Sequence, residues 1–449
     1  MDELSDFCQK ISRLYSANQW NISKAREVVA ELNNFLYTNY DGIGTTKALG
    51  STFDYFSDFH KYWEQNYKDI LDCTINESKC EKVAEALHAV CVNTEGASFA
   101  SVSSEYKDSG LEGEAICKIR LLTANQDFRE SLSFEQLANV YRDDPTVFDE
   151  VFIESEPERF LSSIGINRLS QNDKRTKYAK NIADFILNST KEFTDDKVYH
   201  LIDHYHGDLF ALRQDLISKA NAGYGEKKTD MVLRDMVVSK IWKNVRNFDK
   251  INVASDVNTI KVALRTGILA TAIPLVSSFL DIFCNQYSYM DHQCAQAWRR
   301  VWEIWMERYP QDNIGSPCLL DFFVYNVVGK QFCKTNLYIY ECDDKKHTFP
   351  WNSANRRTCQ VCYDLYHKRV PAHVVQRVMA CCHPDGKVAI RQTKYVQSLP
   401  DSQRIDACPF IHICEHKNLM PPKSISILGQ TGWNSAYSKR GNGGGGLMA

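Results

Sequence analysis

The sequence predicts a mainly α-helical fold, with a helix-hairpin-helix segment near its centre and a cysteine-rich C-terminal part. Apolar residues recur at helical spacing through most of the first 335 residues, which is the main sign of amphipathic helices. The stretch "NAGYGEKK", residues 221–228, places a Gly-Tyr-Gly turn between two such segments. Nine of the 16 cysteines lie at or after Cys318. These observations favour helices packed around a hairpin, followed by a smaller part that a metal would stabilise.

We divide the 449 residues into four regions on these grounds. They are an acidic, mostly helical N-terminal extension (1–150), a helical core (151–335), a Cys-rich region (336–430) and a Gly-rich tail expected to be flexible (431–449). In the extension, "ISKAREVVAELNNFLY" and "CEKVAEALHAVCV" predict helices, and "NTEGASFASVSSEYKDSG" predicts a loop. The acidic segment "YRDDPTVFDEVFIESEPERF", with its two prolines, marks the expected boundary to the core.

The core contains the clearest helical patterns. "NDKRTKYAKNIADFILN" predicts a helix with a basic face of Lys174, Lys177 and Lys180 and an apolar face of Ile182, Phe185 and Ile186. "DLFALRQDLISKA" predicts a helix that ends at the hairpin, and the next helix begins near Lys227 and continues through "TDMVLRDMVVSKIW". Another helix follows Asp256, with Ile260, Ala263, Leu264 and Ile268 on its apolar face. We expect "ILATAIPLVSSFL", from Ile268 to Leu280, to be a buried helix and "LYIYEC" to be a strand.

Composition and charge bear on location and partner. The acidic start "MDELSDFCQK" has no apolar signal segment, so we expect a cytoplasmic protein without a membrane span. The overall charge of −3 hides an uneven distribution. Residues 1–150 hold 14 Lys and Arg against 26 Asp and Glu, whereas residues 151–449 hold 39 against 30. The second part is therefore basic enough to bind a polyanion.

The hairpin has the residue types of a phosphate-binding element. Gly223 and Gly225 permit positive φ and the close approach of another backbone, and Tyr224 can pack into the core of the hairpin. The helix that follows directs unpaired N–H groups outward, which suits a phosphate without reading a base. The alternative is a simple turn with solvated lysines. Asp256, similarly, is either a helix N-cap or a rigidly held anion.

Two segments together resemble a known enzyme family. "GYGEKKTD" resembles the Gly-x-Gly-x-Lys-x-x-Asp hairpin of the HhH-GPD superfamily of DNA glycosylases, and "VASDVNTIKVALRTGIL" resembles its Val-Asp-x-His-Val-x-Arg segment. The resemblance covers about residues 155–335. It implies a helix-hairpin-helix glycosylase core in which Lys227 and Asp256 are catalytic and Gly223, Gly225 and Lys228 contact DNA.

The resemblance also has departures. The family's usual His and Arg are Asn258 and Lys261 here, which indicates different contacts to the DNA backbone. The interval of 29 residues between Lys227 and Asp256 is closest to the archaeal 8-oxoguanine glycosylase branch. Lys228 is the neighbouring alternative to Lys227 as the nucleophile.

The implied mechanism follows from these residue types. The target nucleotide must leave the duplex and enter a pocket. Asp256 would stabilise the positive charge that develops on the sugar as the bond to the base breaks. A neutral Lys227 amine would attack the sugar and form a Schiff base, which permits strand cleavage. Partial burial, the adjacent Lys228 and the helix N-terminus would favour the neutral amine.

The cysteine-rich region suggests a metal site. "CPFIHIC", from Cys408 to Cys414, has the Pro and the spacing with which the resembled family ends the ligand set of a [4Fe–4S] cluster, and "CQVC" supplies Cys359 and Cys362. Zinc is the alternative metal, and buried unliganded thiols are the alternative to any metal. Further candidate metal ligands are Cys333, Cys342, Cys381, Cys382, His347, His383 and His416. Basic residues of this region that could contact the DNA backbone are Arg356, Arg357, Lys368 and Arg369.

We therefore expect a nucleoid-associated DNA glycosylase that excises a damaged or modified base, with Schiff-base lyase activity. The substrate would be an oxidised purine or a bulkier, hypermodified base of foreign phage DNA, which connects the protein to repair or antiviral defence. One alternative is a non-catalytic helix-hairpin-helix DNA-binding module of such a complex. Another is an N-glycosidase of RNA or nucleotides.

Overall fold

A computed structural model describes most of residues 65–332 and short segments elsewhere. The described residues are 9–10, 13, 19–28, 30, 62–63, 65–102, 104–126, 132–167, 172–273, 287–332, 338–342, 348–350, 375–380 and 408–414. The expectations for Cys359, Cys362 and the Gly-rich tail lie outside these residues. The same holds for Cys333, Cys381 and Cys382, for the three candidate histidines and for the four basic residues named with them.

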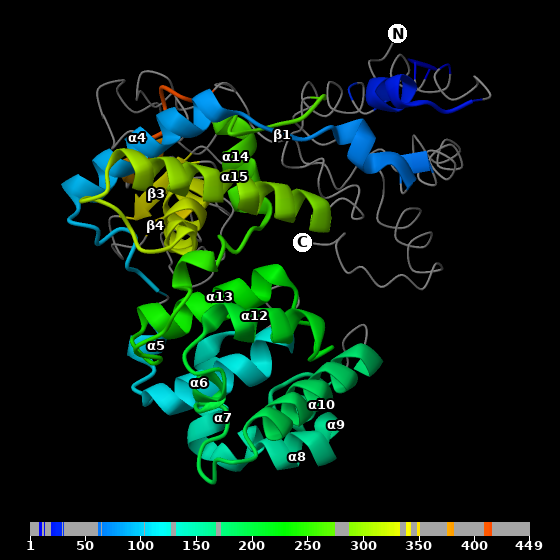
Figure 1. The fold of residues 1–449 in the computed structure, drawn as a ribbon, viewed down its shortest axis with the longest axis vertical. Coiled ribbons are helices and arrows are strands. Elements are labelled where there is room, and N and C mark those ends of the chain that lie inside the picture. Colours follow the sequence, from blue (N-terminus) through cyan, green and yellow to red (C-terminus); the bar gives the residue numbers. More distant parts are fainter. Residues whose placement is uncertain are drawn as a thin grey trace. The chain divides into compact units, whose positions relative to one another are not determined.

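The described chain is mainly helical, as the sequence predicts (Figure 1). Its helical elements are α4 (Glu77–Asn93), α5 (Ser104–Asp108), α6 (Gly113–Thr123), η1 (Ala124–Gln126), α7 (Phe134–Asp143), η2 (Pro145–Phe148), α8 (Glu150–Ser155), α9 (Pro157–Ser163), α10 (Asn172–Ser189), α11 (Leu201–His204), α12 (Leu209–Ser218), α13 (Glu226–Val238), η3 (Phe248–Lys250), α14 (Val257–Thr266), α15 (Tyr287–Arg308), η6 (Pro317–Leu319), α16 (Leu320–Phe322) and the π-helix η7 (Phe323–Phe332). Its strands are β1 (Thr74–Ile75), β2 (Leu269–Ala270), β3 (Tyr338–Cys342), β4 (Thr348–Pro350) and β5 (Val375–Ala380).

The chain forms two compact units, each built from segments that are distant in sequence. The first contains residues 1–90, 257–297 and 324–441, and the second contains residues 91–256, 298–323 and 442–449. In the first unit, β1 pairs antiparallel with β2, and β3 pairs antiparallel with β4 and β5. The strand expected at "LYIYEC" is therefore confirmed as β3. The division predicted at residues 150, 335 and 430 stays a prediction.

The second unit is a helical body that includes α6 to α10, α12 and α13 (Figure 1). Its core is apolar and contains side chains from nearly every one of these helices, including the fully buried Phe148, Phe160, Ile182 and Leu212. The prediction for α10 is confirmed. Ile182 and Ile186 are buried, whereas Lys174 and Lys177 are exposed, so the helix has the two faces that its sequence indicates.

The acidic, proline-containing segment at 141–160 is built of short helices. Pro145 and Pro157 each stand at the start of a helical element, where a residue without an N–H causes no loss of hydrogen bonding. The Asp149 side chain caps α8 by accepting from the N–H groups of Val151 and Phe152. Acidic residues and prolines therefore begin helices here instead of forming an extended connection.

Two helix predictions need correction. The helix after the hairpin ends at Val238 and does not reach Trp242, because Lys240 adopts a positive φ of 58° and the N–H of Ile241 turns back to Met236. The expected helix from residue 268 does not begin there. Residues 269–270 instead form strand β2, because their backbone pairs with β1. The remainder of that run, from residue 274, is outside the described residues.

Asn258 and Lys261, the two departures from the resembled motif, have a structural role in the first unit. Lys261 is buried, and its Nζ atom donates to Asn258 Oδ1 and to the Gly329 carbonyl, each at 3.1 Å. A Cβ atom on Gly329 would lie 2.9 Å from the Cβ of Asn258, so only glycine permits this approach. These hydrogen bonds join α14 to η7. The Lys261 amine therefore contacts other residues of the protein.

Candidate functional site

A turn lies between α12 and α13 at the predicted position. α12 ends at Ser218, α13 begins at Glu226, and the intervening Gly223 has a φ of 75°. Tyr224 is buried, and its hydroxyl donates to the Leu121 carbonyl at 2.5 Å. The tyrosine is buried as expected, but its hydroxyl contacts α6 and not the core of the hairpin itself.

The two glycines of the hairpin have different reasons for being glycine. A Cβ atom on Gly223 would lie 2.5 Å from the ring of Tyr178 in α10, in addition to its positive φ. Gly225 has a φ of −94°, and a Cβ atom there would meet no atom within 4 Å. Gly223 is therefore required by the packing of the hairpin on α10, whereas Gly225 leaves open space before the N-terminus of α13. This space would allow a phosphate to reach the N–H groups at the start of α13.

The hairpin is fastened to the rest of the unit by side-chain amides. Asn125 Nδ2 donates to the carbonyls of Tyr178, at 3.1 Å, and Ala222, at 3.0 Å. Asn181 Nδ2 donates to the Asn221 carbonyl at 2.9 Å. These contacts hold the turn in one position relative to α10. The sequence analysis did not select Asn125, because its partners lie 53 and 97 residues away.

The two lysines after the hairpin have different environments. Lys227 is exposed, and its amine has no hydrogen bond or ion pair within the described residues. Lys228 is half-buried, and its Nζ atom donates to the Asn125 carbonyl at 3.2 Å. Lys228 therefore supports the hairpin, and Lys227 is the one that is accessible to a ligand. The partial burial expected for Lys227 is not observed.

Asp256 has the position that its sequence context predicts. It directly precedes α14, at the N-cap position, and is half-buried. Carboxylates are favoured there because unpaired N–H groups and the helix dipole stabilise the anion. The structure therefore gives Asp256 the location of a cap, which is compatible with a second role as a fixed anion.

Asp321 in α16 is a candidate residue that the sequence analysis missed. It is buried, and its Oδ2 atom accepts from Arg234 Nη1 at 2.8 Å. Burial raises the pKa of Asp321 to about 7, although Arg234 and Lys227 lower it, and the charges of Asp256 and Asp235 add to the rise. A buried acid with a perturbed pKa among other charged groups is typical of functional sites.

Asp321 is anchored to a buried charged network. Arg234 donates two hydrogen bonds to Asp235 Oδ1, at 3.1 and 2.7 Å. The other oxygen of Asp235 accepts from the Tyr106 hydroxyl at 2.6 Å and lies 3.8 Å from Arg120. Hydrogen-bonded networks of this kind restrict the motion of their members. The position of the Asp321 carboxyl is therefore well defined.

Asp230, the last residue of the "GYGEKKTD" segment, has a structural partner. Arg213 in α12 donates to both of its oxygens, at 2.5 and 2.9 Å, and both side chains are buried. Burial raises the pKa of Asp230 to about 6, even though Arg213 lowers it. This bidentate ion pair connects the two helices on either side of the hairpin.

Of the four expected metal ligands, two are described. Cys408 and Cys414 are both buried and lie at the ends of one short helical turn, with the Cys414 N–H bonded to the Phe410 carbonyl. Within the described residues, no three or more His, Cys, Asp or Glu side chains form a group with metal-site geometry. Cys359 and Cys362, which would complete the set, are outside those residues.

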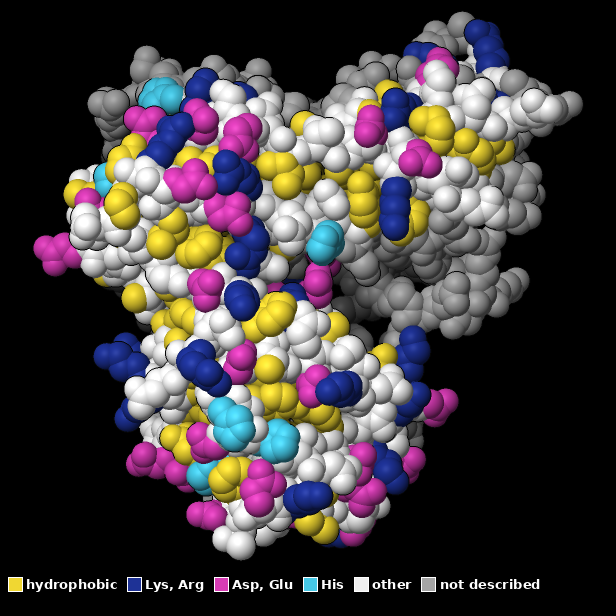
Figure 2. Space-filling model, viewed as in Figure 1, with side chains coloured by type: hydrophobic (Ala, Val, Ile, Leu, Met, Phe, Trp, Pro, Cys, Tyr) yellow, Lys and Arg dark blue, Asp and Glu magenta, His cyan; other side chains and the backbone are white. Residues whose placement is uncertain are grey.

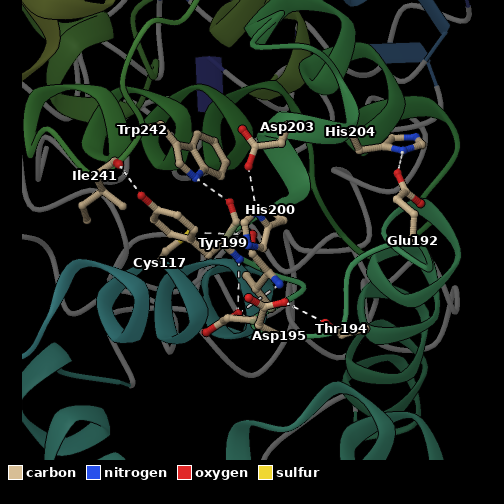
Figure 3. A network of polar contacts seen from close by, with 12 residues as sticks. Cys117, Glu192, Thr194, Asp195, Tyr199, His200, Asp203, His204, Ile241 and Trp242 are labelled. Atoms are coloured by element: carbon tan, nitrogen blue, oxygen red, sulfur yellow. Dashed lines mark hydrogen bonds and ion pairs between the residues drawn. The ribbon is translucent and has the colours of Figure 1, made fainter.

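A second polar cluster lies around α11 in the same unit (Figure 3). His200 Nδ1 is 2.7 Å from Asp203, and His204 Nδ1 is 3.2 Å from Glu192. The His200 ring also stacks on Phe193, with ring centroids 4.6 Å apart. Hydrogen bonding within its own segment and from His204 lowers the pKa of Glu192. These pairs fix the connection between α10 and α12, and the sequence analysis did not identify them.

Charge is mixed on the visible surface. On the face drawn in Figure 2, Lys and Arg side chains are interspersed with Asp and Glu, without a large field of either sign. Near the hairpin, Lys174 lies one helical turn before Tyr178, the residue against Gly223, and both Lys174 and Lys177 are exposed. Among the described residues, few exposed basic side chains therefore lie near the hairpin.

No protein-family model, curated protein or solved structure matches this chain. Among the described helices, none has both the length and the apolar composition needed to cross a bilayer.

Proposed function

We propose that this protein is a DNA glycosylase that extrudes a damaged or chemically modified base and excises it, with Schiff-base chemistry at Lys227. One observation carries the proposal: Lys227, at the start of α13 and directly after the glycine turn, is exposed and makes no hydrogen bond or ion pair within the described residues. The hairpin beside Lys227 supports it, because its open glycine permits a phosphate to approach the helix N-terminus. We place the protein with DNA in the cytoplasm.

The proposed chemistry assigns one task to each residue. Asp256 is the fixed anion that stabilises the oxocarbenium-like sugar. The neutral form of the Lys227 amine attacks the sugar carbon and gives the Schiff base. Lys228 is assigned to the hairpin, because its amine is bonded to the Asn125 carbonyl. Gly225 permits the close approach of the DNA backbone, and Gly223 holds the turn against α10.

The substrate we propose is an oxidised purine or a bulkier hypermodified base, including those of phage DNA. The support is the interval between Lys227 and Asp256 and the length of chain outside the hairpin core. A structural [4Fe–4S] cluster would be held by Cys359, Cys362, Cys408 and Cys414, with zinc as the alternative. Of these, Cys408 and Cys414 are both buried and lie on one short turn.

The decisive experiment compares matched lysine variants. Purified protein is incubated with single-stranded, double-stranded and base-modified DNA, and both base release and borohydride trapping are measured. Lys227→Gln is expected to abolish trapping while DNA binding and folding survive, because this side chain is exposed. Lys228→Gln is the control and should retain trapping. The roles of the two lysines are exchanged if trapping disappears only in Lys228→Gln.

Asp256→Asn tests the anion separately from the cap. Asparagine is as good an N-cap as aspartate, so folding should be little affected. Base release should fall by about 10²- to 10³-fold, since an electrostatic contact to the transition state is lost. If base release is unchanged in both Asp256→Asn and Lys227→Gln, the chemistry is not located at these residues.

A non-catalytic DNA-binding module is the second candidate. The observation that favours it is the exposed group of lysines on α10 and α13, which could bind phosphates without any reaction. This function predicts DNA binding that weakens with salt and no base release from any substrate.

A further inference from the structure

One face of α10 lies directly beside the turn between α12 and α13. The Tyr178 ring is against the turn, since a Cβ atom on Gly223 would be 2.5 Å from it. Further along the same face, Asn181 Nδ2 donates to the Asn221 carbonyl at 2.9 Å. Lys177 is adjacent to Tyr178 and one helical turn before Asn181. These contacts place the side of α10 that contains Lys177 and Tyr178 next to the turn.

This face presents two groups that are suited to a phosphate. Lys177 is exposed, and its amine makes no hydrogen bond or ion pair with any described residue. The Tyr178 hydroxyl also has no hydrogen-bond partner among those residues, although the side chain is half-buried and its ring is held by the turn. Both side chains commonly donate to phosphate oxygens. Lys180, in contrast, forms an ion pair with Glu154 of α8 at 3.2 Å.

The turn offers backbone donors at the same place. Asn221 and Gly223 have positive φ values of 47° and 75°. Within the described residues, the N–H groups of Gly223 and Gly225 donate no backbone hydrogen bond. Unpaired N–H groups in turns of this kind form anion-binding concavities. A phosphate bound there would lie beside α10, because the Tyr178 ring contacts Gly223.

The spacing fits one strand of DNA. Lys177 lies about 6 Å along the axis of α10 from Asn181, the residue that is bonded to the turn. One DNA strand carries a phosphate every 3.4 Å or so, roughly, along the duplex axis. A strand with one phosphate at the turn therefore has a neighbouring phosphate within reach of the exposed Lys177 amine. Positions 174, 177, 178 and 181, which share this face, hold no carboxylate. Asp184, two turns after Lys177, already accepts from Asn188 at 2.9 Å.

We propose that α10 and the turn bind one DNA strand at neighbouring phosphates, with the turn holding one and Lys177 and Tyr178 contacting the next. The inference takes DNA as the ligand from the proposed function and adds a second binding element to it. Both contacts are to the sugar-phosphate backbone, so they place the strand without reading its bases. Lys177 and Tyr178 position the strand and take no part in the chemistry assigned to Lys227.

Binding of duplex DNA at several salt concentrations tests the lysine. Each lysine-phosphate contact contributes about 0.9 to the slope of log affinity against log salt, because counterions are released. Lys177→Gln should reduce the slope by about 0.9 and weaken binding at low salt by about 10-fold, equally for unrelated sequences. Lys180→Gln is the matched control, since its amine is paired with Glu154, and should keep the wild-type slope. A wild-type slope in Lys177→Gln, or equal effects of the two substitutions, overturns the proposal.

Tyr178→Phe tests the hydroxyl separately from the charge. The ring that contacts Gly223 is retained, so hydrogen exchange of α10 should stay at the wild-type rate. Binding should weaken by about 2- to 10-fold without a change in the salt slope, since a neutral hydroxyl releases no counterion. Wild-type affinity in a folded Tyr178→Phe variant overturns the tyrosine contact.

Single-turnover base release separates this inference from the glycosylase function. At saturating DNA, Lys177→Gln should release base at the wild-type rate, and at low DNA concentration it should be slower by its binding deficit. A slower rate at saturation overturns the positioning role. If no tested DNA loses a base but Lys177→Gln still has the reduced salt slope, the glycosylase function fails and binding by α10 stands. If wild type binds no DNA, both fail.

Discussion

Gly223→Ala isolates the contact that places the hairpin on α10. The substitution adds one methyl group at a residue with a φ of 75°, directed at the Tyr178 ring. At 2.5 Å, the new carbon and the ring cannot both keep their positions. Either Tyr178 moves, or the hairpin separates from α10 and strains the amide contacts of Asn125.

Two costs determine the size of the effect. An alanine in the left-handed region costs about 1 to 2 kcal/mol, and forcing an extra carbon into a packed contact costs about 1 to 3 kcal/mol. Together they predict a loss of about 2 to 5 kcal/mol in the free energy of opening the hairpin region. Gly225→Ala is the matched control. It has space and a permitted φ, so its effect should be within about 1 kcal/mol.

Hydrogen exchange measured by mass spectrometry is the suitable assay, since it reports the opening of α10 and α13 separately from the rest of the chain. Peptides from both helices should exchange faster in Gly223→Ala and at nearly the wild-type rate in Gly225→Ala. Equal protection in the two variants would show that the contact between Gly223 and Tyr178 does not position the hairpin.

Two further predictions concern the buried ion pair and the metal. Arg213→Met should destabilise the second unit by about 3 to 5 kcal/mol at pH 8, because it leaves the buried Asp230 charge without its partner. The deficit should shrink toward pH 5, as Asp230 becomes protonated, and a deficit independent of pH in urea unfolding would contradict this account. Purified protein should be brown if the cluster is present. If the protein is colourless and contains stoichiometric zinc, the metal is zinc and not an iron–sulfur cluster. If it contains neither metal, the cysteines are unliganded core residues.

The parts of the structure that depend on local pattern were predictable from the sequence. Helical spacing of apolar residues located α10, α12 and the start of α13, and the glycine pair located the turn between them. The end of α13 was not predictable to the residue, because Val238 is followed by residues with the same helical spacing. The left-handed Lys240 that ends the helix depends on how the chain packs afterwards.

The missed site residues depend on contacts between distant segments. Asp321 belongs to a three-residue helix without periodicity, and its partner Arg234 is 87 residues earlier. The difference between Lys227 and Lys228 also has no local signal. It arises because the Asn125 carbonyl lies close to only one of the two amines. Adjacent lysines look equivalent in sequence until the fold gives one of them a partner.

The contacts of Asn125 limit which residues near the hairpin can be substituted. Its amide nitrogen joins α10 to the hairpin, and its backbone carbonyl receives Lys228, so one residue outside the hairpin determines the position of the hairpin. Only a short side chain with two N–H donors can make both amide contacts, and among the natural residues that is asparagine. Gly225 and Lys227, in contrast, face open space. Substitutions at Gly225 and Lys227, which a ligand would contact, can therefore change the ligand without moving the hairpin. Asn125, which holds the hairpin in position from η1, must stay asparagine.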